Sequence, residues 1–226
     1  MTATTPRFAL IDRLVQGPNR PRVIFCDWHG VLCQKPYWHS ITDDSNNPLH
    51  AILAGELDRL FTAGNRNGRD WMRGLHTSHD ILRALADRHT HLDVDELLAR
   101  LVEDIARMPV DQPLLQTLRH ARAFATIVLA TDNIDTFTTT FRDIQNGRVS
   151  AGTDPEVLSG VVSVFDDILS SSELGVLKSE NSQTFFGPWL RRAGLSFADA
   201  LLIDDREDNC IAFERHSGAA LQWGAV

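Results

Sequence analysis

Five short runs of apolar residues predict the strands of a parallel sheet. The first covers 22–26, and four more follow at 125–130, 167–170, 200–203 and 219–222. Short continuous apolar runs are typical of parallel strands that are buried on both faces. Helical patterns alternate with these runs at about 112–123, 134–145, 181–193 and 207–216. The alternation predicts an α/β fold, a doubly wound parallel sheet that forms a Rossmann-like core.

One long segment between the first two predicted strands breaks this alternation. A crossover between parallel strands needs only about a dozen residues, and this segment is far longer. It shows helical patterns at 49–61, 68–75, 78–88 and 94–108, with Asp93 or Asp95 as the N-cap of the last and Pro109 as its end. We therefore expect 34–110 to form a helical cap domain, and 1–33 with 111–226 to form the α/β core domain.

The sequence leaves the structure of two further segments undecided. The polar segment 145–160 is longer than a usual connection, and it fits either a mobile flap or a plain surface insertion. Residues 1–20 fit either a disordered leader or a short helix packed on the core.

Composition and charge bear on the partners and the cellular location expected for the protein. The net charge of −8 and the lack of a basic cluster argue against nucleic acid as a partner. No apolar run is long enough to span a membrane, and the N-terminus lacks the layout of a signal peptide. The three cysteines, Cys26, Cys33 and Cys210, have no metal-binding or disulfide spacing, so we expect packed thiols and a cytoplasmic location.

Side chains that carry chemistry follow four of the predicted strands. In open α/β sheets, ligands bind outside the carboxyl ends of the strands. Carboxylates there could bind Mg²⁺ or act as a nucleophile, and a lysine could hold a carboxylate or a phosphoryl group. The alternative for each aspartate is a simple helix cap. The residues at these strand ends are Asp27 and His29, then Thr131, Asp132 and Asn133, then Lys178, and finally Asp204 and Asp205.

The sequence around these residues resembles the haloacid dehalogenase superfamily, in the subgroup with a helical cap inserted after the first strand. The four motifs occur in family order. They are VIFCDWHGVL at 23–32, IVLAT at 127–131, SELGVLK at 172–178 and LLIDDREDN at 201–209.

The resemblance implies a role for each motif residue. It makes Asp27 the nucleophile and a Mg²⁺ ligand, with the backbone carbonyl of His29 and the side chain of Asp205 as further ligands. It places Asp204 in support of the metal or of Lys178. It makes Thr131 and Lys178 the groups that bind phosphate, with Asp132 and Asn133 beside them. The implied activity is Mg²⁺-dependent hydrolysis of a phosphate monoester through an aspartyl-phosphate.

His29 departs from the family pattern, in which phosphatases have an aspartate as acid and base. Imidazole can also exchange protons near neutral pH. Three alternatives follow: His29 replaces the aspartate in a working phosphatase, it marks a weakened member that binds a phosphorylated metabolite without turnover, or it marks a dehalogenase-like hydrolase of other substrates. A His29→Ala variant with unchanged turnover would exclude the first.

The expected cap carries a group of basic and aromatic residues around Trp71. Trp71 and Arg73 are candidates for binding substrate, by stacking on a ring and by pairing with a second anionic group. The alternative is a core tryptophan beside a solvated helix face. Trp38 and His39 fit either a site entrance or the packing of a hinge. A small cap suggests a compact soluble substrate such as a sugar phosphate.

Overall fold

The computed structural model of the protein describes residues 20–62, 65–149 and 154–224. Its centre is a parallel sheet with the strand order β3-β2-β1-β4-β5. The strand β1 lies in the middle, and the order reverses on either side of it, as in doubly wound folds. This confirms the predicted fold class. The strands are β1 (Val23–Cys26), β2 (Thr126–Thr131), β3 (Asp167–Ser170), β4 (Ala200–Asp204) and β5 (Ala219–Gln222).

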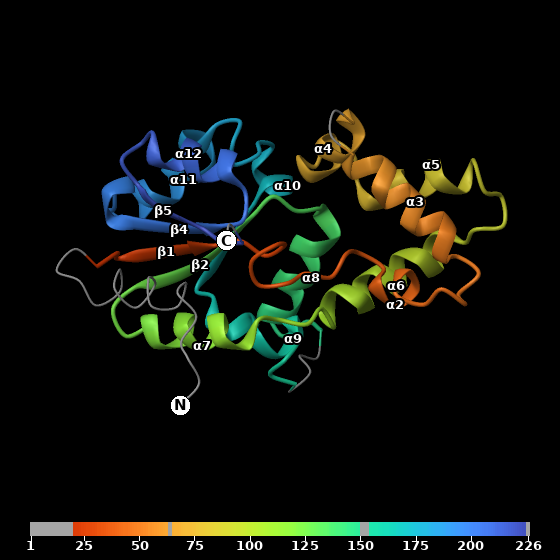
Figure 1. The fold of residues 1–226 in the computed structure, drawn as a ribbon, viewed down its shortest axis with the longest axis horizontal. Coiled ribbons are helices and arrows are strands. Elements are labelled where there is room, and N and C mark those ends of the chain that lie inside the picture. The colour runs from red at the N-terminus through yellow and green to blue at the C-terminus, as the bar shows by residue number, and fades with distance from the viewer. Residues whose placement is uncertain (1–19, 63–64, 150–153, 225–226) are drawn as a thin grey trace.

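Helices cover both faces of the sheet because successive side chains of a strand point to opposite faces. Val23 and Phe25 of β1 pack in one buried cluster with the aromatic side chains of α11 and α12. Ile24 and Cys26 face the other cluster, to which α7 and α8 contribute. Figure 1 shows α11 and α12 on one side and α7 on the other. The core helices are α7 (Gln112–Ala121), α8 (Asp135–Gln145), α9 (Leu158–Val161), α10 (Ser171–Leu174), α11 (Ser182–Arg192) and α12 (Glu207–Glu214), with short 3-10 turns at Val162–Val164 and Phe197–Asp199.

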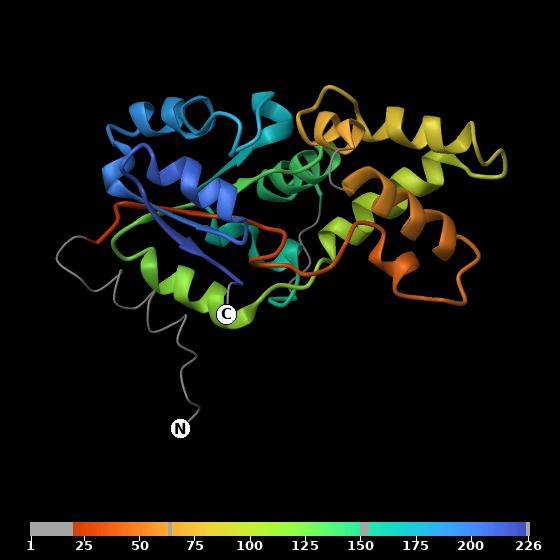
Figure 2. The same ribbon diagram turned by 45° about the horizontal axis from the view of Figure 1, so that its top comes forward.

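A second group of helices lies between β1 and α7 in the chain. Figures 1 and 2 show this group side by side, beyond one end of the sheet. Asp93 is the N-cap of the last of them, since its side chain accepts hydrogen bonds from the backbone N–H of Asp95 and Glu96. The group consists of α2 (His39–Thr42), α3 (His50–Phe61), α4 (Arg66–Met72), α5 (Ser78–Ala86) and α6 (Val94–Ala106).

The chain leaves the core and returns to it at neighbouring points. The backbone N–H of Asp111 donates to the carbonyl of Leu32 at 2.8 Å. This contact lies at the predicted boundaries of the cap, 33/34 and 110/111. The division into two domains stays a prediction, and we call α2–α6 the cap helices below.

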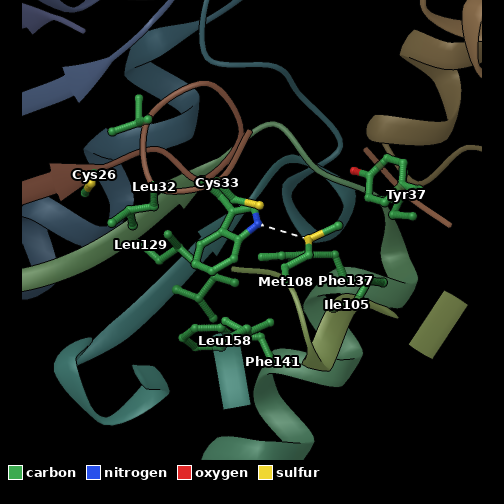
Figure 3. Packing of buried hydrophobic residues seen from close by; sticks show 14 of the residues in the cluster. Cys26, Leu32, Cys33, Tyr37, Ile105, Met108, Leu129, Phe137, Phe141 and Leu158 are labelled. Atoms are coloured by element: carbon green, nitrogen blue, oxygen red, sulfur yellow. Dashed lines mark hydrogen bonds between the residues drawn. The ribbon is translucent and has the colours of Figure 1, made fainter. Parts of the chain in front are cut away.

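Trp28, the residue after Asp27, ties this junction to the core. Its indole N–H donates to the sulfur of Met108 at 3.3 Å, and its ring packs against Phe137 (Figure 3). Cys26 and Cys33 belong to the same buried cluster. All three cysteines are buried and free, which fits the packed thiols expected from the sequence.

The segment 145–160 contacts the returning chain where the structure describes it. Pro109 and Val157 form an isolated antiparallel bridge, and Val110 N–H donates to the carbonyl of Glu156. Residues 150–153 lie outside the described part, as does nearly all of 1–20, so neither open question about these segments is tested. No helix of the described chain is long and apolar enough to cross a membrane.

Candidate active site

A cavity of about 580 Å³ lies between the carboxyl ends of the strands and the cap helices. Asp27, His29, Asp132 and Asp205 line it from the core. These residues follow β1, β2 and β4, which are neighbours in the sheet. The parallel order therefore brings together side chains that are far apart in the sequence, as predicted.

Lys178 is the cation at the centre of this group. It is completely buried, and its ammonium lies 2.7 Å from Asp27 Oδ2 and 2.5 Å from Asp204 Oδ2. It also donates to the backbone carbonyl of Ala130 at 3.1 Å. Burial alone lowers the pKa of Lys178, but Asp204, Asp27 and Asp132 raise it well above its usual value. The residue is therefore a permanent cation.

All three N–H donors of Lys178 thus have partners in the protein. The structure shows it as the partner of Asp27 and Asp204, which orients the Asp27 carboxylate. The phosphate-binding role predicted for Lys178 stays a prediction, and it requires one of these hydrogen bonds to be exchanged.

The three aspartates offer oxygens that could hold one cation. One carboxylate oxygen from each of Asp27, Asp204 and Asp205 lies within 4.8 Å of the others. Hard carboxylate oxygens suit Mg²⁺. Gly30 lies directly against Asp205, because a Cβ at Gly30 would lie 2.2 Å from Asp205 Oδ2. The donor set and the tight approach of the backbone therefore fit a Mg²⁺ site at this position.

Within this set, the Asp204 carboxylate is already committed to other partners. Its Oδ2 accepts from Lys178, and its Oδ1 accepts from the Arg206 backbone N–H and from Asn209 Nδ2, both at 3.0 Å. Asp204 is fully buried, and of these three aspartates only Asp27 and Asp205 line the cavity. Of the two roles predicted for Asp204, support of the metal or of Lys178, the second matches this geometry better.

Asn133 has a side-chain orientation that its neighbours determine. Its Oδ1 accepts from the backbone N–H of Ile134 at 2.9 Å, and a backbone N–H can only donate. The Tyr37 hydroxyl, which contacts the same oxygen, must therefore be a donor as well. The amide Nδ2 then donates to Thr131 Oγ1 at 3.3 Å and faces His29 Nδ1 at 3.5 Å.

This arrangement fixes the tautomer of His29. Because Asn133 Nδ2 carries only hydrogens, His29 Nδ1 must be the acceptor, and the ring proton of the neutral form lies on Nε2. Nε2 is buried and has no hydrogen-bond partner among the described residues. Burial lowers the pKa of His29 to about 4, against a smaller opposite effect of the Lys35 carbonyl. Burial therefore favours the neutral ring of His29 at pH 7, and the contact with Asn133 favours the tautomer with its proton on Nε2.

The tautomer can be tested directly by ¹⁵N NMR of the histidine rings in the metal-free protein. We expect the His29 signals of the Nε2–H form, assigned with a His29→Gln variant. Asn133→Asp should shift the ring toward the Nδ1–H form, since a carboxylate can only accept from it. Tyr37→Phe is the control, because Ile134 still orients the amide. An Nδ1–H form in the wild type would contradict the assignment.

Thr131 and Asp132 lie at the end of β2, and only Asp132 reaches the cavity. Thr131 is completely buried, and its hydroxyl oxygen accepts from Asn133. Asp132 Oδ1 accepts from the Lys178 backbone N–H at 3.0 Å, and burial raises the pKa of Asp132 to about 6. The structure places both beside Asp27 and Lys178 but leaves their predicted contact with phosphate untested.

The structure corrects the roles predicted for Trp71 and Arg73. Trp71 is completely buried, and its indole N–H lies near Ser78 Oγ and Asp135 Oδ1. It does not line the cavity, so it cannot stack on a substrate in this conformation. Arg73 is paired with Asp70 and Glu180 and also lies outside the cavity lining. The alternative of a core tryptophan is the correct one.

Trp38 likewise belongs to the packing of the hinge. It is buried, and its indole N–H donates to the carbonyl of Leu97 in α6 at 2.9 Å. Neither Trp38 nor His39 lines the cavity.

Glu180 connects the cap helices to the core. It accepts from Arg69 Nη2 at 2.6 Å and from Arg73 Nε at 2.9 Å, and both arginines lie at α4. Although burial alone raises the pKa of Glu180, hydrogen bonds from Arg73 and Arg69 lower it to about 2. The carboxylate is therefore ionised at any physiological pH, and the contact holds α4 against the loop after Lys178.

We expect Glu180→Gln to lower the free energy of unfolding by about 1 kcal/mol at pH 7. A group whose pKa is lower in the folded state stabilises the protein above its unfolded pKa of about 4.3. The difference between wild type and variant should therefore be constant from pH 8 to pH 5 and shrink as the pH falls toward 2. Urea unfolding at several pH values measures it. Glu173→Gln, which removes an exposed pair with Arg142, is the control.

Several cavity residues could not be found from the sequence. Tyr37 and Phe61 line the cavity from the cap side, and Arg206 lines it from the core. Tyr37 is the only tyrosine of the chain and lies shortly after the first motif, which is a weak signal. Glu180 has no local pattern that predicts its partners, because both arginines are about a hundred residues away.

Solved structures with the same fold are hydrolases. One is a predicted HAD-like family hydrolase from Porphyromonas gingivalis, 16% identical, with a TM-score of 0.64 and 91% of this chain and 93% of that chain covered. A HAD family enzyme from Bacteroides thetaiotaomicron, in complex with magnesium and inorganic phosphate, is 15% identical, with a TM-score of 0.65 and coverage of 91% and 96%.

A third is an L-2-haloacid dehalogenase from Xanthobacter autotrophicus with chloropropionic acid covalently bound. It is 12% identical, with a TM-score of 0.58 and coverage of 88% of this chain and 76% of that chain. No protein-family model and no curated protein sequence matches the chain. At these identities the comparisons establish the fold of this chain but not the reaction that it catalyses.

Proposed function

We propose that this chain, which has the fold of the haloacid dehalogenase-like hydrolases, hydrolyses small phosphorylated metabolites with Mg²⁺ as cofactor. The observation that carries the proposal is the contact of Asp27 with the buried cation Lys178, next to Asp205 at the cavity. A carboxylate oriented by a buried ammonium, beside oxygens that suit Mg²⁺, is an arrangement for phosphoryl transfer.

Asp27 would be the nucleophile. Its Oδ1 accepts from the Trp28 backbone N–H at 2.7 Å, and its Oδ2 contacts Lys178, so the carboxylate has one orientation. Its attack forms a bond to phosphorus while the bond to the ester oxygen breaks, and the leaving alkoxide takes up a proton from water. Water then cleaves the aspartyl-phosphate, which releases phosphate and restores the carboxylate.

Asp27, Asp205 and the backbone carbonyl of His29 would hold the metal. Mg²⁺, when bound, would supply positive charge that neutralises the phosphoryl oxygens. The ammonium of Lys178, 2.7 Å from Asp27 Oδ2, would add to that charge. Burial and the neighbouring Asp204 raise the pKa of Asp205, so this carboxyl benefits from a cation beside it.

A second candidate function, binding of a phosphorylated metabolite without turnover, depends on the state of His29. As the acid and base of a phosphatase, His29 would have to exchange a proton with the leaving oxygen and then with water. The neutral Nε2–H ring derived above has neither an imidazolium proton nor a free lone pair at Nε2. This favours, as the alternative, a weakened member that binds a phosphorylated metabolite without turnover.

The test measures phosphate release from acetyl phosphate and p-nitrophenyl phosphate with Mg²⁺ and with EDTA. We expect release with Mg²⁺ and none with EDTA. Tight Mg²⁺-dependent binding of orthovanadate without release from either substrate would support the binding protein instead. Chloride release from 2-chloropropionate in EDTA would support the dehalogenase-like alternative, because that chemistry needs no metal.

A further inference from the structure

The two walls of the cavity differ in chemistry. The core wall carries the charged and polar residues described above. The cap wall carries mostly apolar side chains, which are Pro36, Tyr37, Leu57, Leu60, Phe61 and Met72. If the core wall holds the phosphoryl group, the cap wall faces the organic part of the substrate.

The few polar side chains of the cap wall already have partners in the protein. The Thr62 hydroxyl donates to the carbonyl of Asp58 at 2.5 Å. Asn65 Nδ2 donates to the carbonyl of Arg59 at 2.5 Å, and its Oδ1 accepts from the backbone N–H of Asn67 at 2.9 Å. These hydrogen bonds belong to the caps of helices α3 and α4, so each group has fewer free donor and acceptor sites for a ligand.

The other two polar side chains of the cap wall, Arg69 and Tyr37, also have partners in the protein. Arg69 is paired with Glu180 at 2.6 Å, and the Tyr37 hydroxyl donates to Asn133. Within the described part of the cap wall, every polar side chain therefore has a partner in the protein. A sugar carries many hydroxyl groups, and burying them here without hydrogen bonds would cost free energy.

Phe61 is the large apolar side chain that this wall exposes. It is 40% exposed, which is unusual for a side chain of its size beside a cavity. Its ring lies at 22° to the buried ring of Trp71, with centroids 6.1 Å apart, and 6.1 Å from the ring of Tyr37. Trp71 thus supports Phe61 from behind, and an aromatic surface remains that a ligand could cover.

We infer that the substrate is the monophosphate ester of a compact apolar alcohol, aromatic or alicyclic, rather than a sugar phosphate. The inference rests on the proposed function, since it assigns the phosphoryl group to the core wall. A volume of about 580 Å³ accommodates a phosphate and a ring. The apolar ring would cover Phe61, and the hydrophobic effect would favour its burial.

The experiment compares substrates that differ only in the polarity of the organic part. Cyclohexylmethyl phosphate and glucose 6-phosphate are both esters of a primary alcohol on a six-membered ring, so their leaving groups are similar. Benzyl phosphate adds an aromatic ring. Acetyl phosphate, which is too small to reach the cap wall, reports the phosphatase activity itself.

We expect kcat/KM for cyclohexylmethyl and benzyl phosphate to exceed that for glucose 6-phosphate by at least about tenfold. Phe61→Ala should raise KM for benzyl phosphate about tenfold, and its effect on KM for acetyl phosphate should be smaller. Ile211→Ala is the matched control, because Ile211 is similarly exposed, at 41%, and does not line the cavity. Phe61→Leu, which keeps an apolar side chain, should lose less than Phe61→Ala.

The outcomes distinguish the two proposals, which are the phosphatase activity and the apolar class of substrate. Hydrolysis of acetyl phosphate together with equal or better hydrolysis of glucose 6-phosphate overturns the substrate class and leaves the phosphatase standing. The same holds if both Phe61 variants, shown to be folded by their thermal unfolding, keep the wild-type KM for benzyl phosphate. Hydrolysis of none of the four substrates overturns the proposed function, and the inference with it.

Discussion

Replacing Asp27 by asparagine should reduce Mg²⁺-dependent phosphate release at least about a thousandfold. The amide keeps one oxygen that can accept from the Trp28 backbone N–H, while its NH2 group replaces the oxygen that contacts Lys178. It cannot form an acyl-phosphate, because a neutral amide is a poor nucleophile. It also removes one of the carboxylates that would hold the metal.

Single-turnover kinetics with p-nitrophenyl phosphate measures this loss, and acid quenching of the wild type tests for phosphate bound to the protein. Asp43→Asn is the control, since Asp43 forms an exposed pair with Lys35 and lies outside the cavity lining. If Asp27→Asn retains more than a tenth of the wild-type rate, another residue is the nucleophile.

Replacing Lys178 by methionine should lower the free energy of unfolding by about 3–5 kcal/mol, measured with urea in the absence of Mg²⁺. Methionine fills similar space but leaves the buried carboxylates of Asp27 and Asp204 without their cation. An unpaired buried charge is costly, and protonation of one carboxylate relieves only part of that cost.

Lys35→Met is the matched control for this variant. Lys35 pairs with Asp43 at the same distance of 2.7 Å, but both side chains are more than 40% exposed. We expect its effect on the free energy of unfolding to stay below about 1 kcal/mol. Equal losses for the two variants would mean that the site around Lys178 does not behave as a buried charge cluster.

The fold could be predicted largely from local patterns. Each buried strand is a continuous apolar run, and the helices that matter for topology have clear periodicity. The short helices α2, α9 and α10, of four residues each, were not predicted, because one helical turn leaves no periodic signal. Their boundaries depend on tertiary contacts rather than on the chain itself.

The candidate site also contains residues that the sequence predicts and residues that it does not. Asp27, Lys178 and Asp205 follow strand ends, so the topology alone brings them together. The expected roles of Trp71 and Arg73 were wrong, because residue type and helical spacing do not show which face of α4 packs inward. The tautomer of His29 depends on hydrogen bonds among Asn133, Ile134 and Tyr37. No sequence pattern indicates the direction of these hydrogen bonds.

The single junction between Leu32 and Asp111 has a consequence for protein engineering. Because the outgoing and returning chain segments meet at the hydrogen bond between Leu32 and Asp111, the α/β core presents two neighbouring attachment points for whatever lies between them. Inserted segments whose ends lie close together are tolerated well by a host fold. Helices α2–α6 could therefore be exchanged for those of a relative that also cover α8, because α6 packs against α8 in the shared hydrophobic cluster. Such chimeras would carry a different recognition surface above the same Asp27 and Lys178.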